Sequence, residues 1–383
     1  MHIFVPRESK AGERRVAIVP DVIAKYLRAG FSVSVEGGAG VHALADDESL
    51  RSAGATIASA SEISKADVVL SVNPLTAEQF SQLKKGAITI SFLSPNQSLD
   101  SISASAKAGA TSFSLELVPR ISRAQSMDAL TSQALCAGYR AALVAAELAP
   151  RFFPLLMTAA GTVTPANVVV LGAGVAGLQA IATARRLGAV VSAYDVRPAS
   201  ADEVRSMGAT FIDLQLEALD GAGGYAREMS EERAAKQREL LTPYLANADV
   251  VITTAAVPGR PAPRLVTEEM VGAMKPGAVV VDLAAESGGN VAGSTPGEIT
   301  ERNGVRIWGG KDVPSQLPFH ASQLFAKNCM NLLMLMVKSE EGKSSLHLDF
   351  GDEIIAASAV THQGEVRHEG AKALLANSSG GAR

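Results

Sequence analysis

Cysteine and aromatic residues are scarce in this chain of 383 residues. It contains two cysteines, and aromatic side chains make up 4% of the sequence. Cys136 and Cys329 both stand in apolar, helical stretches, so we expect two buried free thiols rather than a disulfide or a metal-binding pair. Free thiols fit a reducing compartment. With few aromatics and much alanine and valine, the composition favours α/β layers with closely packed helices.

Long apolar runs and a strong charge of one sign are also missing. The chain has no run of about 18 uncharged apolar residues, the length needed to cross a membrane. Its most apolar window, residues 332–337, is short. The amino-terminal residues lack the apolar region of a signal peptide. The formal net charge is −4, which predicts no broad basic surface for nucleic acid. We therefore expect neither a membrane span nor nucleic-acid binding.

Patterns typical of metal sites and serine hydrolases are absent as well. The six histidines are scattered, and none stands beside a cysteine at metal-ligand spacing. No G-x-S-x-G sequence occurs. We predict no metal site. Hydride chemistry remains possible because a bound nicotinamide needs neither a metal nor a nucleophilic serine.

Length and periodicity indicate two domains. Hydrophobic residues make up 47% of the chain, enough for more than one core. The first third alternates strands and helices, which predicts a parallel sheet with right-handed crossovers. The expected strands are residues 2–5, 32–35, 68–72, 88–93 and 111–117. The expected helices are residues 21–28, 61–65, 77–83 and 99–107.

Two long helices are expected to join this domain to a second one. The first covers residues 126–153, with Ser126 as its N-cap and Asp128 in its first turn. The second covers residues 321–338. The predicted fold is α/β, with two Rossmann-like, doubly wound parallel-sheet domains joined by long helices. The expected domains are residues 1–128 with 325–383, and residues 129–324.

The second domain begins another α/β pattern. Its later elements are expected to be a helix at residues 201–207 and strands at 210–212, 250–254, 279–283 and 305–308. Beyond the second long helix, residues 346–350 and 353–359 are expected to form a short hairpin. The polar, glycine-rich tail at 375–383 predicts a disordered segment or a linker.

The most informative stretch follows the predicted strand at residues 168–171. Gly172, Gly174 and Gly177 stand at G-x-G-x-x-G spacing before a helix that Gly188 ends. In such a motif the glycines permit a tight turn, close approach of a pyrophosphate and packing of helix on strand. A second strand, residues 190–194, follows the helix. This context predicts a dinucleotide site, and the alternative is an ordinary glycine-rich βαβ turn.

The residue after the second strand bears on which dinucleotide is bound. Asp195 can accept both ribose hydroxyls of an adenosine, and its carboxylate would repel a 2′-phosphate. Arg197 is a complication because a nearby arginine can accommodate that phosphate. We favour NAD(H), since the acid stands at the strand end and the arginine lies beyond it.

Two further segments each allow two interpretations. Arg120, Arg123 and Gln125 crowd a short loop before the first long helix. Pattern alone favours a capping loop with solvated arginines over a polar cluster directed into a cleft between domains. Residues 220–240 combine glycines with a charge-rich stretch, which indicates either a functional lid or a surface loop leading into a solvated helix.

Four segments together resemble one family. They are PRISRAQSMD, MTAAGTVTPANVVVLGAGVAGLQAIATARRLGAVV, AGGYAREM and KPGAVVVDLAAESGGN. They are similar to the NAD(H)-binding component of the proton-translocating NAD(P) transhydrogenases, in particular the soluble first alpha subunit of the split bacterial form. The chain length fits that form, in which the membrane helices lie on separate polypeptides.

The resemblance implies specific site residues. Arg120, Gln125 and Asp128 would act at the nicotinamide end as catalytic residues, with Gln125 reaching the ribose of NADP(H) on a partner. Residues 214–240 would form a mobile loop with Tyr225 and Met229 at its apolar tip. The implied nucleotide contacts are Arg120, Ile121, Ser122, Gln125, Asp128, Thr131, Gly172, Gly174, Val175, Ala176, Gly177, Asp195, Val196, Arg197, Gly224, Tyr225, Gln237 and Ala256. The family more often has serine at the position of Thr131.

Alanine dehydrogenase shares the fold of this family, and comparison with it distinguishes transhydrogenase activity from amino-acid dehydrogenase activity. That enzyme binds pyruvate through an arginine, a lysine and a histidine of its first domain. Arg15 of GERRVAIVP matches the arginine. Ser71-Val72-Asn73-Pro74 lacks the lysine, and the region of Phe92-Leu93-Ser94 lacks the histidine. Without this pair the oxidation of an amino or hydroxy acid has no acid–base group.

The resemblance therefore implies hydride transfer between NADH bound here and NADP⁺ on a partner subunit, coupled to proton translocation by membrane partners. It implies a homodimer, an NADP(H)-binding beta subunit and membrane-spanning subunits, with the chain cytoplasmic and peripheral at the cytoplasmic face of the inner membrane. The alternatives are an alanine-dehydrogenase-like NAD-dependent amino- or keto-acid dehydrogenase and a non-catalytic NAD(H)-binding module.

Overall fold

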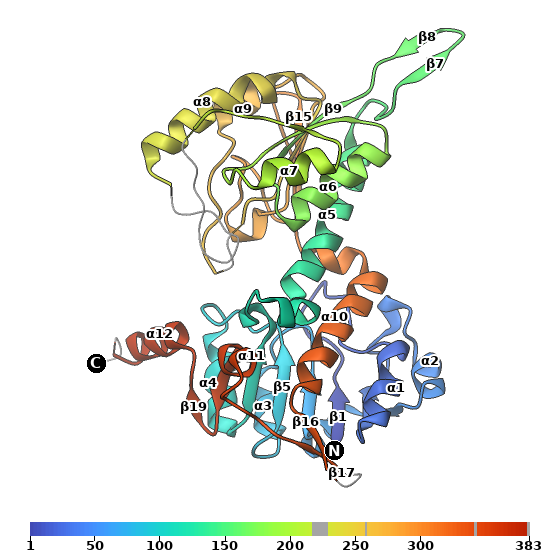
Figure 1. The fold of residues 1–383 in the computed structure, drawn as a ribbon, viewed down its shortest axis with the longest axis vertical. Helices are drawn as coiled ribbons and strands as arrows, with labels where there is room; N and C mark the ends of the chain where they lie inside the picture. The colour runs from blue at the N-terminus through green and yellow to red at the C-terminus, as the bar shows by residue number, and fades with distance from the viewer. Residues whose placement is uncertain (217–228, 257–258, 341–342, 381–383) are drawn as a thin grey trace. The chain divides into compact units, whose positions relative to one another are not determined.

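The structure, a computed structural model, describes residues 1–216, 229–256, 259–340 and 343–380 (Figure 1). The chain divides into two compact units: unit 1 is Met1–Gln133 with Ser315–Arg383, and unit 2 is Ala134–Pro314. Both boundaries differ from the expected positions. The first boundary, after Gln133, falls inside helix α5 (Ala129–Leu148). The start of that helix belongs to unit 1 because Gln133 accepts a hydrogen bond from Arg15.

Unit 1 is built on an eight-stranded sheet in the order β19-β18-β6-β5-β4-β1-β2-β3. Strands β1 to β6 are parallel, and β18 and β19 extend the sheet antiparallel beyond β6. The strands are β1 (His2–Val5), β2 (Ser32–Glu36), β3 (Thr56–Ala58), β4 (Val68–Leu70), β5 (Ile88–Ser91), β6 (Thr111–Ser114), β18 (Ala359–His362) and β19 (Glu365–Val366). A separate hairpin joins β16 (Val337–Glu340) to β17 (Lys343–Leu346).

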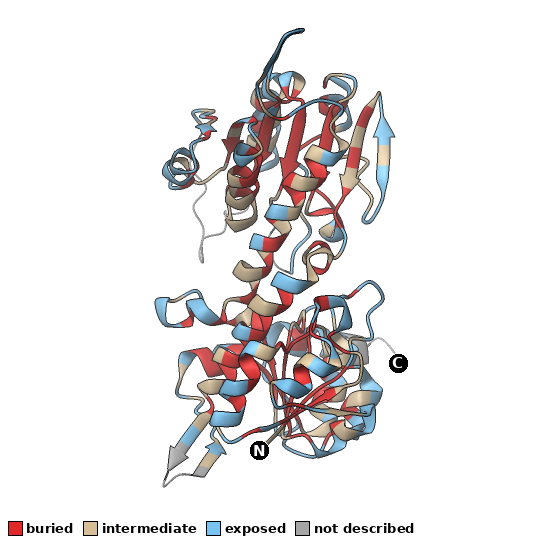
Figure 2. Cartoon of the chain, turned by 90° about the vertical axis from the view of Figure 1, so that its right-hand side faces the viewer, coloured by how far each residue is buried: buried red, intermediate tan, exposed pale blue. Residues whose placement is uncertain are grey.

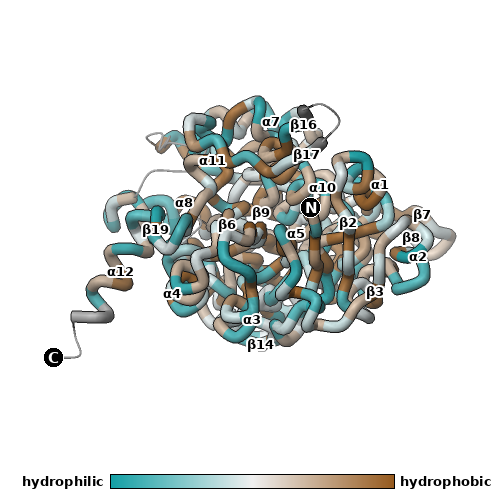
Figure 3. The backbone as a smooth tube through the Cα atoms, turned by 90° about the horizontal axis from the view of Figure 1, so that it is seen from below, coloured by the Kyte–Doolittle hydropathy of each residue, from teal (hydrophilic) through white to brown (hydrophobic). Residues whose placement is uncertain are grey.

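Helices cover both faces of this sheet. Successive residues of β1 alternate between them: Ile3 packs with the cluster that includes α1 and α10, whereas Phe4 packs with Phe80 of α3. Hydrophilic stretches mark the outer helices α3 and α4 (Figure 3). The helices are α1 (Pro20–Arg28), α2 (Asp47–Ser52), α3 (Ala77–Gln82), α4 (Leu99–Ala108), α10 (Pro318–Met334), α11 (Glu353–Ser358) and α12 (Glu369–Gly380), with 3₁₀ turns η1 (Val41–Ala43), η2 (Ala60–Lys65), η3 (Leu115–Leu117) and η4 (Ser122–Met127).

Unit 2 contains a seven-stranded sheet in the order β11-β10-β9-β12-β13-β15-β14. All neighbouring strands are parallel except β14 and β15. The strands are β9 (Asn167–Leu171), β10 (Val190–Tyr194), β11 (Thr210–Phe211), β12 (Val250–Thr253), β13 (Val279–Asp282), β14 (Ile299–Arg302) and β15 (Val305–Gly309). The strand order reverses between β9 and β12, and ligands of open α/β sheets bind at the carboxyl ends of strands at such a point.

The sheet of unit 2 lies between two helical layers. Val168 and Val170 of β9 pack with α5 and α6, whereas Val169 and Leu171 pack with α8 and α9. The central strands are buried (Figure 2). The remaining elements are α6 (Val175–Arg186), α7 (Ser200–Ser206), α8 (Glu231–Asn247), α9 (Glu268–Gly272), η6 (Ala285–Ser287), η7 (Val313–Gln316) at the second boundary, and an antiparallel hairpin of β7 (Leu156–Thr158) and β8 (Gly161–Val163).

The predicted fold class is confirmed, since both sheets are parallel at their centres and covered by helices on two faces. Several local predictions are wrong. Ser126 lies in η4 and does not cap the first long helix, because Asp128 accepts the amide of Thr131 instead. That helix ends at Leu148. Residues 353–358 form α11 rather than a hairpin strand, because the side chain of Asp352 caps them.

Two further stretches of the chain differ from expectation. The tail is helical as far as Gly380 rather than a disordered segment or linker, because residues 371–376, AKALLA, are all strong helix formers. The segment expected as a lid is helical from Glu231 onward, where Ser230 accepts the amide of Arg233 as an N-cap. Its residues 217–228 lie outside the described part of the chain.

Candidate dinucleotide-binding site

The predicted glycine turn connects β9 to α6 in unit 2. Gly172 has φ of +100°, which favours glycine, and a Cβ there would lie 2.7 Å from Oγ1 of Thr254. At Gly177 a Cβ would lie 1.9 Å from the carbonyl oxygen of Gly172. The fold itself therefore requires glycine at two of the three positions of the motif.

Gly174 has a different reason to be glycine. Its φ of −75° and ψ of −169° are accessible to any residue, and a Cβ would meet no atom within 4 Å. Gly174 is the N-cap residue of α6, and no side chain caps that helix. The amides of Val175, Ala176 and Gly177 lie in its first turn, where the helix dipole favours an anion. The fold does not require glycine here, and the open space beside Gly174 is compatible with the predicted close approach of a pyrophosphate.

Asp195 lies at the end of β10, beside this turn. Its Oδ2 accepts the amide of Ala173 at 2.8 Å, and Oδ1 accepts the amide of Arg197 at 2.9 Å. The guanidinium of Arg197 also binds both oxygens, through Nε and Nη2, each at 2.8 Å. The Asp195 side chain is 7% exposed. Asp195 and Arg197, which favour different nucleotides when considered separately, thus form one ion pair. Val196, between them in the sequence, is partly buried.

Two residues that the sequence did not predict as site residues, Thr254 and Asn290, fix the segment after β12 beside the glycine turn. Thr254 donates its hydroxyl to the carbonyl oxygen of Gly172 at 3.0 Å. Asn290 is fully buried and binds both the amide and the carbonyl oxygen of Ala255, at 3.0 and 2.8 Å. Asn290 follows Gly288 and Gly289, which both have positive φ. This Gly-Gly-Asn sequence after the buried strand β13 is the sequence feature that could have identified Asn290 as a site residue. The exposed Ala256 follows the segment that Asn290 fixes.

The predicted lid contacts are only partly described. Gly224 and Tyr225 lie outside the described residues, and Met229 is partly buried. Gln237 is 2% exposed, and its Oε1 accepts the hydroxyl of Tyr194 at 2.9 Å. Burial raises the pKa of Tyr194, so the phenol remains a hydrogen-bond donor at neutral pH. In this structure Gln237 therefore ties α8 to the end of β10.

The predicted nicotinamide loop lies in unit 1. Arg120, Ser122 and Gln125 are exposed, whereas Ile121 packs against the core. Arg123 binds both carboxylate oxygens of Asp352, at 2.6 and 3.0 Å. Arg123 is therefore paired with the N-cap residue of α11, although its side chain remains 48% exposed.

Asp128 and Thr131 are brought together as one pair. Oδ1 of Asp128 accepts the amide of Thr131 at 2.8 Å, and Oδ2 accepts its hydroxyl at 2.6 Å. This arrangement caps α5. A serine would make the same two bonds, so the threonine found here preserves the geometry of the cap.

A buried polar cluster lies where β1 and β4, the strands at which the order of unit 1 reverses, have their carboxyl ends. Glu13 binds Arg15 through Nε at 2.8 Å and Nη2 at 2.6 Å, and Arg15 donates through Nη1 to Gln133 at 2.9 Å. Asn73 donates to Glu8 at 2.9 Å and to Glu13 at 3.0 Å. Arg15 is only 8% exposed, and its three nitrogens are engaged by the chain's own side chains.

The two glutamates of this cluster differ in their acidity. Burial opposes the charge of Glu13, but the hydrogen bonds and charge of Arg15 outweigh it and lower the pKa of Glu13 to about 2. Burial raises the pKa of Glu8 despite its bonds from Asn73 and Val72. One carboxylate of the cluster is thus firmly ionised as the partner of Arg15.

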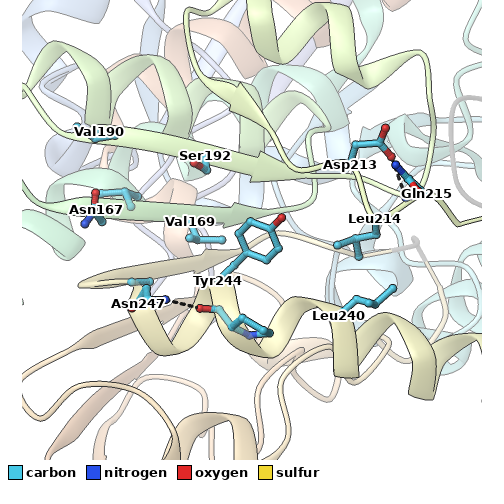
Figure 4. A pocket seen from close by; sticks show the side chains of 13 residues that line it. Asn167, Val169, Val190, Ser192, Asp213, Leu214, Gln215, Leu240, Tyr244 and Asn247 are labelled. Atoms are coloured by element: carbon cyan, nitrogen blue, oxygen red, sulfur yellow. Dashed lines mark hydrogen bonds between the residues drawn. The ribbon is translucent and has the colours of Figure 1, made fainter.

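The cavity shown in Figure 4 lies elsewhere. It has a volume of 710 Å³, and its lining includes Asn167 and Val190, at the amino ends of β9 and β10, together with Leu240 and Tyr244 of α8. Neither the glycine turn nor Asp195 lines it. The predicted residues Gly172 and Asp195 follow the carboxyl ends of β9 and β10 instead.

Two negative findings hold for the described residues. Among them, no group of three or more histidine, cysteine, aspartate or glutamate side chains could hold a metal ion. Within the same ranges, no helix is both long and apolar enough to cross a bilayer. Cys136 and Cys329 are buried free thiols, as predicted.

Comparison with known proteins places these features in context. The model of the alanine dehydrogenase/PNT N-terminal domain matches residues 4–137, and that of the C-terminal domain matches residues 141–369. The chain is 49% identical over 378 residues to the first of the separate parts of NAD(P) transhydrogenase subunit alpha in Rhodospirillum rubrum, covering 96% of this chain and 98% of the relative.

Two further similarities bear on the activity. The crystal structure of transhydrogenase from Sinorhizobium meliloti matches with a TM-score of 0.85 and 45% identity, covering 96% of this chain and 99% of that one. Alanine dehydrogenase of Mycobacterium tuberculosis is 34% identical over 301 residues, covering 77% of this chain and 76% of the relative.

Proposed function

Since the chain belongs to the alanine dehydrogenase/PNT family and its near relatives are transhydrogenase alpha subunits, we propose that it is the NAD(H)-binding component of a proton-translocating NAD(P) transhydrogenase. The observation that carries this proposal is the cluster around Arg15. A keto acid would need that guanidinium, but Glu13 and Gln133 already bind it. Asn73 stands where a proton-transferring lysine would be needed and bonds to two glutamates.

The proposed reaction needs no acid–base group from this chain. A hydride, which is one proton with two electrons, leaves C4 of the dihydronicotinamide of NADH. It forms a bond to C4 of the nicotinamide of NADP⁺ on the partner, so that NADH becomes NAD⁺ and NADP⁺ becomes NADPH. The contribution of this chain is to bind one nucleotide and fix its ring in a near-attack position.

The site residues keep the roles that the resemblance implies. The amides of Val175, Ala176 and Gly177 bind the pyrophosphate, while Asp195, Val196 and Arg197 surround the adenosine. The Asp195–Arg197 pair supports NAD(H) over NADP(H), because the guanidinium that could bind a 2′-phosphate is already engaged by the carboxylate.

The remaining roles concern the two loops and the nicotinamide end. Arg120 and Asp128, with Thr131, hold the carboxamide and ribose end, beside Ile121 and Ser122. Gln125 reaches the ribose of NADP(H). Gly224, Tyr225 and Gln237 contact the nucleotide from the lid, and Ala256 forms a wall of the adenosine pocket.

The partners follow from this assignment. We propose an NADP(H)-binding beta subunit and membrane-spanning subunits that couple the transfer to proton movement, with this chain at the cytoplasmic face of the inner membrane. A homodimer is also proposed. Exposed apolar side chains on and beside the β7–β8 hairpin support it, since Leu155 is 54% and Met157 81% exposed, and such side chains mark a surface for another chain. Sedimentation of Met157→Glu should then show a larger monomer fraction than wild type, whereas an unchanged distribution would contradict this surface.

One experiment distinguishes the three functions considered. The purified chain is mixed with NADH and with the NADP(H)-binding subunit of a bacterial transhydrogenase, and reduction of an NADP analogue is followed. Turnover only with the partner supports the proposal. Formation of NADH from alanine and NAD⁺ by the chain alone would support a dehydrogenase, and NADH binding without either reaction would support a binding module.

A further inference from the structure

The 3₁₀ turn η4, which carries Gln125, is fixed from helix α10 by two side-chain amides. Nδ2 of Asn328 and Nδ2 of Asn331 each donate to the carbonyl oxygen of Ser126 at 3.0 Å. Asn328 is 6% exposed, and its Oδ1 accepts the hydroxyl of Ser132 at 2.7 Å. Asn328 therefore bonds at the same time to the turn and to the first turn of α5.

The other anchors of this segment bracket Gln125. On one side, Arg123 makes its two hydrogen bonds to Asp352, a bidentate arrangement that fixes orientation as well as distance. Asp352 is itself held, since it accepts the amide of Ile354 at 2.8 Å. On the other side, Asp128 is bound by Thr131. The backbone is thus anchored at positions 123, 126 and 128, while the side chain of Gln125 is exposed.

The surroundings of Asn328 indicate that its amide is more than a packing group. Its neighbours on α10, Phe325, Cys329 and Leu332, are fully buried. An apolar residue at position 328 would fit that helix face, and a buried amide is costly unless it is hydrogen-bonded. The side-chain bonds of Asn328 go to Ser126 and Ser132, which lie on either side of Asp128 in the chain.

We propose that Asn328 and Arg123 are positioning residues for hydride transfer, which hold the backbone of η4 so that Gln125 and Asp128 are fixed before the partner's nucleotide arrives. This inference rests on the proposed function. Positioning lowers the barrier because the reacting groups need not be ordered during the reaction, and small misplacements are costly. The two residues act through Gln125 and Asp128 and need not touch either nucleotide.

The test uses Asn328→Leu and Arg123→Gln in the full chain, with the NADP(H)-binding subunit of a bacterial transhydrogenase. Leucine branches at Cγ as asparagine does, and the carbonyl oxygen of Ser126 and the hydroxyl of Ser132 keep their bonds to Asn331 and Ala129, so the melting temperature should change by a few degrees at most. The rate of hydride transfer in a single turnover should fall about tenfold in each variant, and the dissociation constant of NADH should change less than about twofold. Arg123→Lys can still pair with Asp352 and should recover most of the rate.

Matched controls remove bonds of the same kind elsewhere. Asn247→Leu removes an exposed amide that bonds only within its own helix, to Pro243, and Arg51→Gln removes an exposed ion pair with Glu48. Both should transfer hydride at the wild-type rate. The inference is overturned if Asn328→Leu and Arg123→Gln do so too, or if rate, NADH affinity and melting temperature all fall together. If the wild-type chain itself shows no partner-dependent transfer, the proposed function fails instead.

Discussion

The carboxylate of Asp195 is bonded to the backbone amide of Ala173, 22 residues earlier, at 2.8 Å. Through this bond the end of β10 is joined to the glycine turn that follows β9. The same carboxylate binds the guanidinium of Arg197. A ribose that bonds to Asp195 therefore shares a group that already fixes the turn and orients the arginine.

Replacing this carboxylate should weaken NADH binding without unfolding the turn. Asp195→Asn keeps one oxygen to accept the amide of Ala173 but loses the charge and one acceptor for the ribose. We expect NADH affinity to fall by about 2 kcal/mol, roughly thirtyfold. Quenching of Trp308, the only tryptophan, or titration calorimetry would measure it. Asp202→Asn, at a side chain 91% exposed, is the control, and equal affinities in both variants would argue against the ribose contact.

Gly174 and Gly177 should respond oppositely to alanine. A Cβ at Gly174 meets no protein atom, so Gly174→Ala should keep the melting temperature and lose NADH affinity by about tenfold or more, because the Cβ occupies the space for the phosphates. A Cβ at Gly177 overlaps the carbonyl oxygen of Gly172, so Gly177→Ala should lower the melting temperature. Wild-type affinity in Gly174→Ala would show that phosphates do not approach there.

Gln125→Asn should slow hydride transfer with little change in NADH affinity. The shorter side chain keeps its amide but no longer reaches the partner's ribose, so the loss belongs to the ternary complex. Stopped-flow transfer rates and an NADH titration on the same samples separate the two effects. Loss of NADH binding would mean that Gln125 holds this chain's own nucleotide.

Glu13 should make the stability of unit 1 depend on pH in the acid range. The pKa of Glu13 is about 2, against an ordinary value of 4.5, so its contribution is complete above pH 4.5. As pH falls toward 2, the unfolded chain takes up the proton first, and the contribution is lost. The shift corresponds to about 3 kcal/mol at neutral pH.

The measurement compares the free energies of unfolding of wild type and Glu13→Gln at neutral pH and near pH 3. The difference between the two proteins should shrink on acidification. Glu48→Gln, at a side chain 79% exposed, serves as the control. A difference that stays constant across this range would contradict the assigned role of Arg15 as the partner of an ionised Glu13.

Local sequence carried the central parts of the fold because each signal lay within a few residues. The apolar run of β9 and the spacing of Gly172 and Gly177 are short-range features, and they predicted the strand and the turn that the structure shows. The choice of NAD(H), drawn from the acid after β10, stays a prediction. The helix start was misplaced because Ser126 and Asp128 are both good caps, and only the bond to Thr131 decides between them.

The anchors of the candidate site could not be predicted in this way. Arg123 pairs with Asp352 across 229 positions, and Asn328 reaches Ser126 across 202. Such pairs form only when the chain folds, and a single sequence gives no sign of them. The same holds for Asn73, whose place in a cluster with Glu8 and Glu13 depends on β1 and β4 being neighbours.

The most direct test of the account is the partner-dependent transfer rate itself. The chain loaded with NADH is mixed in a stopped-flow instrument with the NADP(H)-binding subunit of a bacterial transhydrogenase. That subunit is loaded with an oxidised NADP analogue whose reduced form absorbs at a different wavelength from NADH, so both nucleotides are followed together. We predict that the reduced analogue appears as NADH disappears, in equal amounts, and that omitting the partner abolishes the reaction. Oxidation of NADH by pyruvate and ammonia without the partner, and no transfer with it, would contradict this prediction.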